Sequence, residues 1–128
     1  MGQPAAKQGD QVTAVDMHLI QPPGPTSPVI VPHPFSGIID NGLSANVNIE
    51  SRPAATLNST ATNTPPHIPI GGTFVKPPSN QARITVGSPT VLINNKPAAR
   101  SGDTALTCND PVDLPAGTVV AVSTVLIG

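Results

Sequence analysis

The sequence predicts an all-β fold of short strands, built from three similar units around a pseudo-threefold axis, with the chain ends close together. The first observation is a repeated tripeptide, Pro-Ala-Ala, at residues 4–6, 53–55 and 97–99. The second is that Val and Ile fall in short alternating runs, whereas no segment has sustained helical periodicity. The third is the 17 Pro and 11 Gly of the 128 residues, which supply many fixed turns.

Composition restricts both the core and the function. Charged residues make up 10% of the chain, the formal net charge is -1, and Trp and Tyr are absent. Without a basic patch or an aromatic platform, we expect no nucleic-acid partner. A core must be built from Val, Ile, Leu and Ala, and a small core of this kind often needs a staple. One cysteine excludes an intrachain disulfide, so the remaining staple is a metal ion.

The first half of the chain is expected to contain short strands and one long loop. Residues 11–15 and 46–50 alternate polar and apolar side chains, as half-buried strands do. Residues 21–36 contain six prolines, which exclude a helix and predict an extended loop, with residues 29–31 as a possible edge strand.

The second half is expected to contain further strands. Residues 73–75 form a short strand or loop between Gly- and Pro-rich flanks. Residues 82–86 and 90–93 are predicted strands, separated by the Gly-Ser-Pro turn at 87–89. The apolar residues 117–128 are predicted to be one strand throughout.

The strand before each Pro-Ala-Ala tripeptide sets the alignment of the units. A valine precedes the proline by six residues and an isoleucine by four, both before Pro53 and before Pro97. If Gly128 were joined to Gly2, the C-terminal strand would stand in the same register before Pro4. We therefore expect the C-terminal strand to complete the first unit. The aligned residues are Val47, Ile49, Val91, Ile93, Val125 and Ile127.

The chain shows no targeting or membrane segment. The first residues have neither a charged region nor an apolar one, so no signal peptide is expected. No stretch reaches the roughly 18 apolar residues of a membrane-spanning helix. We expect synthesis in a reducing cytoplasm, and no toxin domain fused after residue 128.

Three histidines and the cysteine form a candidate zinc set: His18, His33, His67 and Cys108. Three imidazoles and one thiolate satisfy tetrahedral zinc, and four protein ligands leave no position for a reactive water. His18 and His67 each lie fourteen residues after the proline of their unit, so they occupy equivalent positions. The expected ion is therefore structural.

Other interpretations of these residues stay open. Asp10, Asp16, Asp40 and Asp103 are alternative ligands, although Asp10 and Asp103 are more simply turn residues. The histidines can also be unrelated loop residues and the cysteine a buried thiol. A small zinc hydrolase would need an open coordination position and a nearby general base, and no Glu lies near the candidate ligands in sequence. A Pro-rich, metal-free adaptor protein would instead be disordered.

The segment 87–103 resembles the signature of PAAR-repeat proteins, with a strand, a turn, Pro-Ala-Ala-Arg and Gly-Asp in order. Residues 4–10 are a close second copy. The third copy, at residues 52–56, is degenerate, with Thr56 in place of Arg and Ser59 where Asp would stand. The resemblance covers essentially the whole chain and implies a single PAAR domain over residues 1–128, folded as a small cone of short β-strands.

The resemblance also implies a function without catalysis. Such a cone sits with its base on the trimeric spike of a contractile injection machine (type VI secretion, phage tails and related particles), one tip per trimer. A zinc ion near the apex is held by three histidines and one cysteine, which here are His18, His33, His67 and Cys108. The tip is assembled in the cytoplasm, becomes part of the injection particle, contacts the target membrane transiently and can carry an effector.

The six aligned valines and isoleucines are the expected contacts with the spike. Alternation allows only part of this set to face a partner, and the alternative is that all six belong to the protein's own core.

Overall fold

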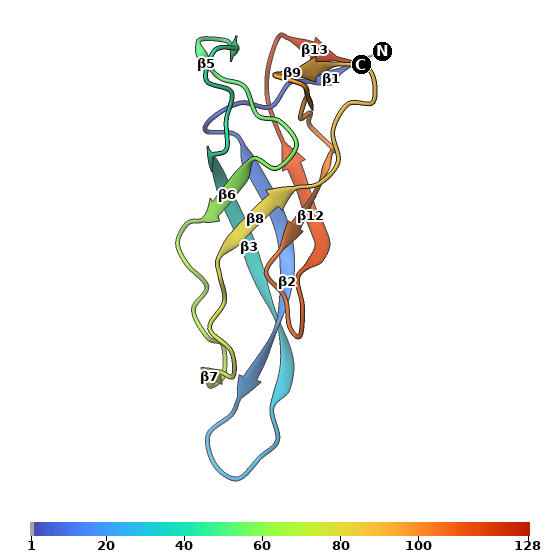
Figure 1. The fold of residues 1–128 in the computed structure, drawn as a ribbon. Helices are drawn as coiled ribbons and strands as arrows, with labels where there is room; N and C mark the ends of the chain where they lie inside the picture. Colours follow the sequence, from blue (N-terminus) through green and yellow to red (C-terminus); the bar gives the residue numbers. More distant parts are fainter. Residues whose placement is uncertain (1) are drawn as a thin grey trace.

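The computed structural model describes residues 2–128, and these contain strands, turns and bends but no helix. Figure 1 shows the strands running along one elongated body, with both chain ends at its broad end. The strands are β1 (Gln3–Pro4), β2 (Gln11–Gln21), β3 (Val29–Asn41), β4 (Asn48–Ile49), β5 (Arg52–Pro53), β6 (Thr60–Asn63), β7 (Thr73–Phe74), β8 (Gln81–Ile84), β9 (Leu92–Ile93), β10 (Lys96–Pro97), β11 (Thr104–Thr107), β12 (Leu114–Val120) and β13 (Leu126–Ile127).

Six strands close into a small barrel. They follow the order β12-β11-β8-β6-β3-β2, and β12 pairs with β2 to complete the circle, with Thr118 opposite Thr13. All pairings are antiparallel. Closure removes the exposed strand edges that would otherwise invite aggregation.

The three expected units are visible in the order of the strands. Each unit begins with a two-stranded hairpin (β13–β1, β4–β5 or β9–β10), followed by two barrel strands (β2 and β3, β6 and β8, or β11 and β12). In the first unit the hairpin joins the two chain ends, with Gln3 opposite Ile127. The prediction that the termini lie together and that the C-terminal strand completes the first unit is confirmed.

The Pro-Ala-Ala tripeptides meet at the pseudo-threefold axis. The amide of Ala6 donates to the carbonyl of Ala99 (3.0 Å), Ala99 donates to Ala55 (3.1 Å), and Ala55 donates back to Ala6 (3.0 Å). All three alanines are completely buried. Because three backbones bond to one another around the axis, only small side chains fit there, which accounts for the alanines.

The core follows the same threefold pattern. The first barrel strands contribute Val12, Ala61 and Ala105, each eight residues after the proline of its unit. The second barrel strands contribute Ile39, Ile84 and Val119, whose carbonyls accept the amides of Gly9, Asn58 and Gly102. Asn58, Gly9 and Gly102 all have positive φ angles, a conformation that favours Gly and Asn.

The expected loop at residues 21–36 is wrong in its second half. Residues 29–41 form β3, which pairs with β2 from Val29 to Ile38. The prolines at 32 and 34 are tolerated because their nitrogens lie on an edge of β3 where no neighbouring strand needs a hydrogen-bond donor. The amide of Ser36 donates toward β6, to Asn63 (2.9 Å), so the two prolines have their nitrogens on that same edge, beyond the end of β6.

The C-terminal stretch is also not one strand. β12 ends at Val120, and β13 begins at Leu126 after a short connection. The connection contains a turn in which Ser123 Oγ accepts the amide of Val125 (2.9 Å). Similar serine turns precede the hairpins of the other units, where Ser44 and Ser88 accept the amides of Val47 and Val91 (both 3.0 Å). The unit boundary therefore interrupts the apolar run.

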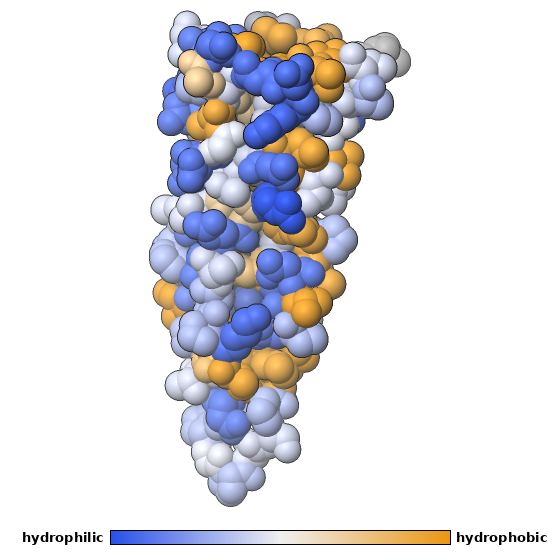
Figure 2. All heavy atoms as spheres, in the orientation of Figure 1, coloured by the Kyte–Doolittle hydropathy of each residue, from blue (hydrophilic) through white to orange (hydrophobic). Residues whose placement is uncertain are grey.

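The molecule tapers from the hairpins to the β2–β3 connection, residues 22–28 (Figure 2). Exposed apolar side chains gather at the broad end and in a band just before the polar narrow tip (Figure 2). Near the tip, the exposed apolar residues include Val29, Ile30, Ile68, Ile70 and Val75. Among residues 2–128 there is no helix of the length and hydropathy needed to cross a bilayer.

Candidate metal centre and docking face

The site lies inside the narrow half of the cone, where β2 and β3 extend beyond the short barrel strands. Along β2, Asp16, His18 and Ile20 are buried and alternate with more exposed residues. Along β3, His33 and Phe35 point to the same interior. The period of two therefore directs polar side chains from both strands into one enclosed space.

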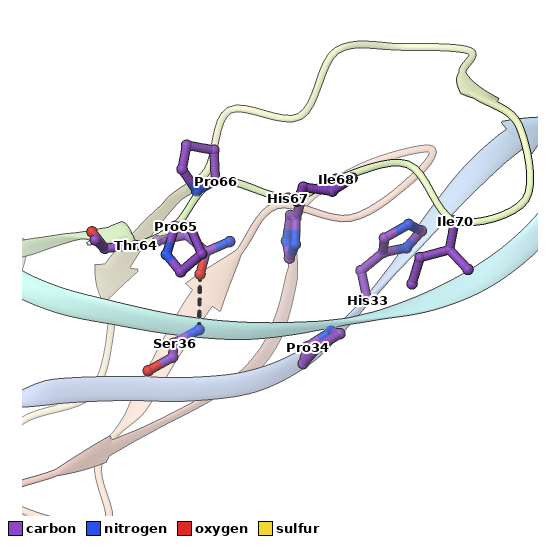
Figure 3. Close-up of a pocket in the computed structure, with 10 residues that line it drawn as sticks. His33, Pro34, Ser36, Thr64, Pro65, Pro66, His67, Ile68 and Ile70 are labelled. Atoms are coloured by element: carbon purple, nitrogen blue, oxygen red, sulfur yellow. Dashed lines mark hydrogen bonds between the residues drawn. The ribbon is translucent and has the colours of Figure 1, made fainter.

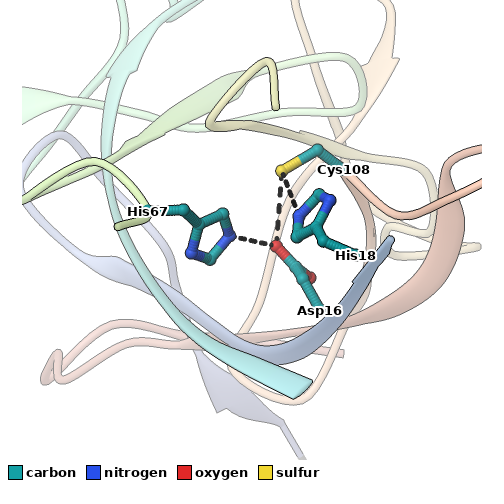
Figure 4. A group of neighbouring side chains, drawn as sticks. All are labelled: Asp16, His18, His67 and Cys108. Atoms are coloured by element: carbon teal, nitrogen blue, oxygen red, sulfur yellow. Dashed lines mark hydrogen bonds and ion pairs between the residues drawn. The ribbon is translucent and has the colours of Figure 1, made fainter. Parts of the chain in front are cut away.

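Four side chains bring metal-binding atoms together there: Asp16, His18, His67 and Cys108 (Figure 4). One donor atom from each lies within 4.8 Å of all the others. The sulfur of Cys108 lies 3.4 Å from Asp16 Oδ2 and 3.7 Å from His18 Nε2, and His67 Nε2 donates to Asp16 Oδ2 at 2.8 Å. This buried cluster could hold a metal ion.

His33 adjoins the cluster. Its ring centroid lies 5.5 Å from that of His18 and 5.7 Å from that of His67. Its Nδ1–H donates to the carbonyl of Val31 (2.9 Å), which leaves the lone pair on Nε2. That Nε2 is buried and has no hydrogen-bond partner among the described residues. Buried polar atoms are rarely left unpaired, so the orphaned nitrogen fits a ligand to an ion.

A second layer of side chains holds β2 in place. Beyond its pairing with β12, the free edge of β2 is covered by residues that follow β11. Asn109 Oδ1 accepts the amide of Met17 (2.6 Å), and Asp110 Oδ2 accepts the amide of Leu19 (2.8 Å). The same Asp110 oxygen lies 3.4 Å from Nδ1 of His18. Asp110 thereby orients the imidazole so that Nε2 faces Cys108.

The environment sets the protonation of the cluster without metal. Burial, with the carboxylate of Asp16 beside it, raises the pKa of the Cys108 thiol to about 11. Burial lowers the pKa of His18, against the opposing effect of Asp110. At neutral pH the thiol is therefore protonated and His18 is neutral, so an incoming ion has to displace the thiol proton but not one from His18.

A cavity of about 350 Å³ opens beside the centre (Figure 3). His33 and His67 line it together with Pro34, Pro65 and Ile70. Figure 3 shows both imidazoles at this wall, so the cavity leads from solvent to the histidines. It offers an ion a path into a site that is otherwise enclosed.

The structure brings three of the four predicted ligands, His18, His67 and Cys108, into the donor cluster together with Asp16, and His33 lies beside them. Asp16 was one of several alternatives, and its place on the interior face of β2 separates it from the others. Asp10 and Asp103 instead close turns by accepting the amides of Lys7 (3.0 Å) and Arg100 (2.7 Å).

The remaining aspartate alternative, Asp40, is exposed on β3. Asn109, Asp110 and Phe74 were not predicted at all. Phe74 packs its ring 5.7 Å from His18 and 5.5 Å from His33. Its only sequence signal was its scarcity, as one of two Phe.

Comparison with protein families supplies the identity of the repeat. Residues 30–113 match the family model described as the PAAR motif, well over half of the 128-residue chain. The chain belongs to the PAAR-motif family. A search of the curated proteins found no similar sequence. The match includes His33, His67 and Cys108, whereas His18 precedes it on β2. The PAAR motif is that of a structural family associated with spike tips.

At the broad end, the predicted spike contacts divide between core and surface. Ile49, Ile93 and Ile127 are only 5%, 8% and 5% exposed and pack against the first alanines of the three tripeptides. Val47 and Val91 are half-buried against the same cluster, and Val125 is exposed. The isoleucines therefore belong mainly to the core of this PAAR protein. The outward neighbours Leu92 and Leu126 are each 61% exposed, and the alignment did not include them because it followed the conspicuous Val and Ile positions.

Proposed function

We propose that the protein is the structural tip of a trimeric spike in a contractile injection machine, with its broad end on the spike. The observation that carries this proposal is the set of three equivalent hairpins around one axis at that end. A single chain with three similar contacts matches a trimer, and the contact stops at one copy because residues 2–128 offer no second such set of hairpins. Membership of the PAAR family supports the same conclusion.

We further infer that the buried centre holds one structural Zn²⁺ through His18, His33, His67 and Cys108. The orphaned Nε2 of His33 and the grouped donors of the other three support this set. Imidazole and thiolate are the ligands that zinc prefers, and a filled tetrahedral set leaves no site for reactive water. The ion would link β2 and β3 to two connections, the one between β6 and β7 that carries His67 and the one between β11 and β12 that carries Cys108. It would thereby stiffen the narrow end.

The remaining parts of the proposal concern partners and place. One tip binds each spike trimer, an effector can be attached, and nucleic acid is not a partner. The apolar band behind the tip suits a transient contact with a target membrane, since few charges there would have to lose water. The protein would be assembled in the cytoplasm and leave it as part of the particle.

Two alternatives have clear tests. A zinc hydrolase would turn over ester or phosphoester substrates when saturated with zinc, and a tip would not. A disordered Pro-rich adaptor is at odds with the closed barrel, and it would give a random-coil circular dichroism spectrum instead of a β spectrum.

The decisive experiment is co-purification with the trimeric spike protein of the same particle, followed by native mass spectrometry. The expected result is one copy of this chain per trimer. A complex with three copies per trimer, or none at all with a folded tip, would contradict the proposal.

Replacing Cys108 with Ser tests the metal centre. The variant should lose its zinc in elemental analysis and melt more than about 10 °C below the zinc-loaded wild type, because a structural zinc contributes on the order of 10 kcal/mol. The matched control is the wild type stripped by a chelator, which should melt close to the variant. An unchanged melting curve would count against a structural ion.

A further inference from the structure

Asp16 lies at the middle of the donor cluster and has no solvent exposure. One oxygen, Oδ2, accepts from His67 Nε2 at 2.8 Å and from the Cys108 thiol at 3.4 Å. The other oxygen, Oδ1, accepts from the hydroxyl of Thr107 and from Asn109 Nδ2 (3.5 Å). The carboxylate is thus fixed from one side and presented to the ligands on the other.

The predicted ligands alone do not select a divalent ion. Imidazoles and a thiolate bind Cu⁺ as well as Zn²⁺, because thiolate sulfur is a soft donor. A carboxylate beside the ion is negatively charged, and its Coulomb attraction to a divalent ion is twice that to a monovalent ion at the same distance. Inside a buried site this difference is weakly screened.

We propose that Asp16 is the specificity-determining residue of this centre, favouring divalent Zn²⁺ over monovalent Cu⁺. The inference rests on the proposed metal centre and places a charged residue beside its four ligands. The buried, unpaired Nε2 of His33 is the independent sign that an ion belongs here. The orientation of Asp16 by Thr107 and Asn109 explains how the carboxylate keeps its place before the ion arrives.

The test is the Asp16→Asn substitution in the full chain. Asparagine keeps the shape and can still accept from Thr107, but it lacks the charge. Affinities for Zn²⁺ and, without oxygen, for Cu⁺ are measured by competition with chromophoric chelators. Zn²⁺ affinity should fall by roughly 10- to 100-fold, as for other residues that support metal ligands. Cu⁺ affinity should fall by only about the square root of that factor, since half the Coulomb attraction is lost.

Asp40→Asn, an exposed change on β3, is the matched control and should leave both affinities unchanged. Equal losses for Zn²⁺ and Cu⁺ in Asp16→Asn would show a merely structural role and overturn the proposal, as would no loss for either ion. Should the Asn variant not fold without metal, Asp16→Glu keeps the charge and should retain the wild-type preference for Zn²⁺. A lowered preference in the Glu variant would also overturn it.

These outcomes separate the two proposals. If Cys108→Ser abolishes zinc binding while Asp16→Asn leaves the ratio of the two affinities unchanged, the metal centre stands and the role of Asp16 falls. If neither substitution affects zinc, the centre itself is wrong. Binding to the spike, measured on the same variants, reports independently on the function of the broad end.

Discussion

Cys108 and His18 differ in their protonation state at neutral pH, before an ion binds. The thiol keeps its proton at neutral pH because burial and Asp16 raise its pKa to about 11, whereas burial lowers the pKa of His18. Binding of the proposed ion through Cys108 would therefore release the thiol proton, and none would be released from His18. The two residues give the centre a defined proton stoichiometry.

Zinc affinity should consequently rise with pH. Below the folded pKa of Cys108, each unit of pH makes the thiol proton about tenfold easier to displace. Between pH 7.5 and 9, the logarithm of the association constant should therefore increase by about one per pH unit. Chelator competition across this range measures the slope. A pH-independent affinity would show that the thiol is already ionised or does not bind.

In the metal-free protein the same thiol makes the free energy of unfolding decrease with pH, whereas it makes zinc affinity increase. Its folded pKa, about 11, lies above the ordinary thiol value of 9.0, so the folded state holds more protons between about pH 9 and 11. The free energy of unfolding should thus decrease as pH rises through that window. Urea melts of the stripped protein should show this decrease in the wild type and lack it in Cys108→Ser, and the same slope in both would refute it.

At the scale of the hairpins, adjacent residues of one strand point in opposite directions, one into the core and one to the surface. On β13, Ile127 is buried among the equivalent isoleucines, while Leu126 is 61% exposed. Ile127→Ala should lower the free energy of unfolding by about 2–5 kcal/mol, as expected for a truncated core side chain. Leu126→Ala should leave stability nearly unchanged and weaken spike binding. Urea melts and co-purification measure the two effects, and the reverse assignment would contradict the proposed face.

The second unit lacks a charge pair that the others possess. Lys7 bonds Asp10 (3.2 Å) and the Val122 carbonyl (2.6 Å), and Arg100 bonds Asp103 (2.8 Å) and the Gly128 carbonyl (3.2 Å). The equivalent pair is Thr56 and Ser59. Beside Thr56 lies a cavity of about 240 Å³, also lined by Asn94 and Lys96. The missing basic side chain accounts for this space.

Restoring both residues should fill the cavity. Thr56→Arg combined with Ser59→Asp should raise the free energy of unfolding by about 1 kcal/mol, the order found for a partly exposed ion pair. Each single change should be neutral or destabilising, since Arg alone faces Lys96 and Asp alone is buried without a partner. A double-mutant cycle in urea measures the coupling, and additive effects would exclude a restored pair.

For the whole molecule, the sequence predicted the threefold plan and most of the centre because both depend on regular spacing. A proline-based register located the units, His18 and His67. It could not rank Asp16 above Asp40, because that depends on which face of β2 and β3 points inward. It could not predict Asn109 and Asp110 either, since they act by covering a strand edge that exists only after β2 extends past the barrel. The strand through Pro32 and Pro34 was missed because proline statistics do not show which edge is free.

Residues 124–128 should contribute more to thermal stability than the connection at the narrow end of the cone. Deleting residues 124–128 removes the partner of β1 and the buried Ile127, so the melting temperature should fall strongly. Deleting residues 23–27, an exposed stretch of the same length, shortens the connection at the narrow end and should change it little. Circular dichroism melts compare the two, and equal losses would mean that the first hairpin adds nothing to stability.

The pairing of β1 with β13 also bears on how the protein is made. Gln3 is synthesised long before Ile127, yet the two residues lie opposite each other in one hairpin. The first hairpin can therefore form only after β13 has been made. Contacts so distant in sequence slow folding. Closure of the cone thus requires β13, and a product truncated before residue 126 would lack one of the three hairpins.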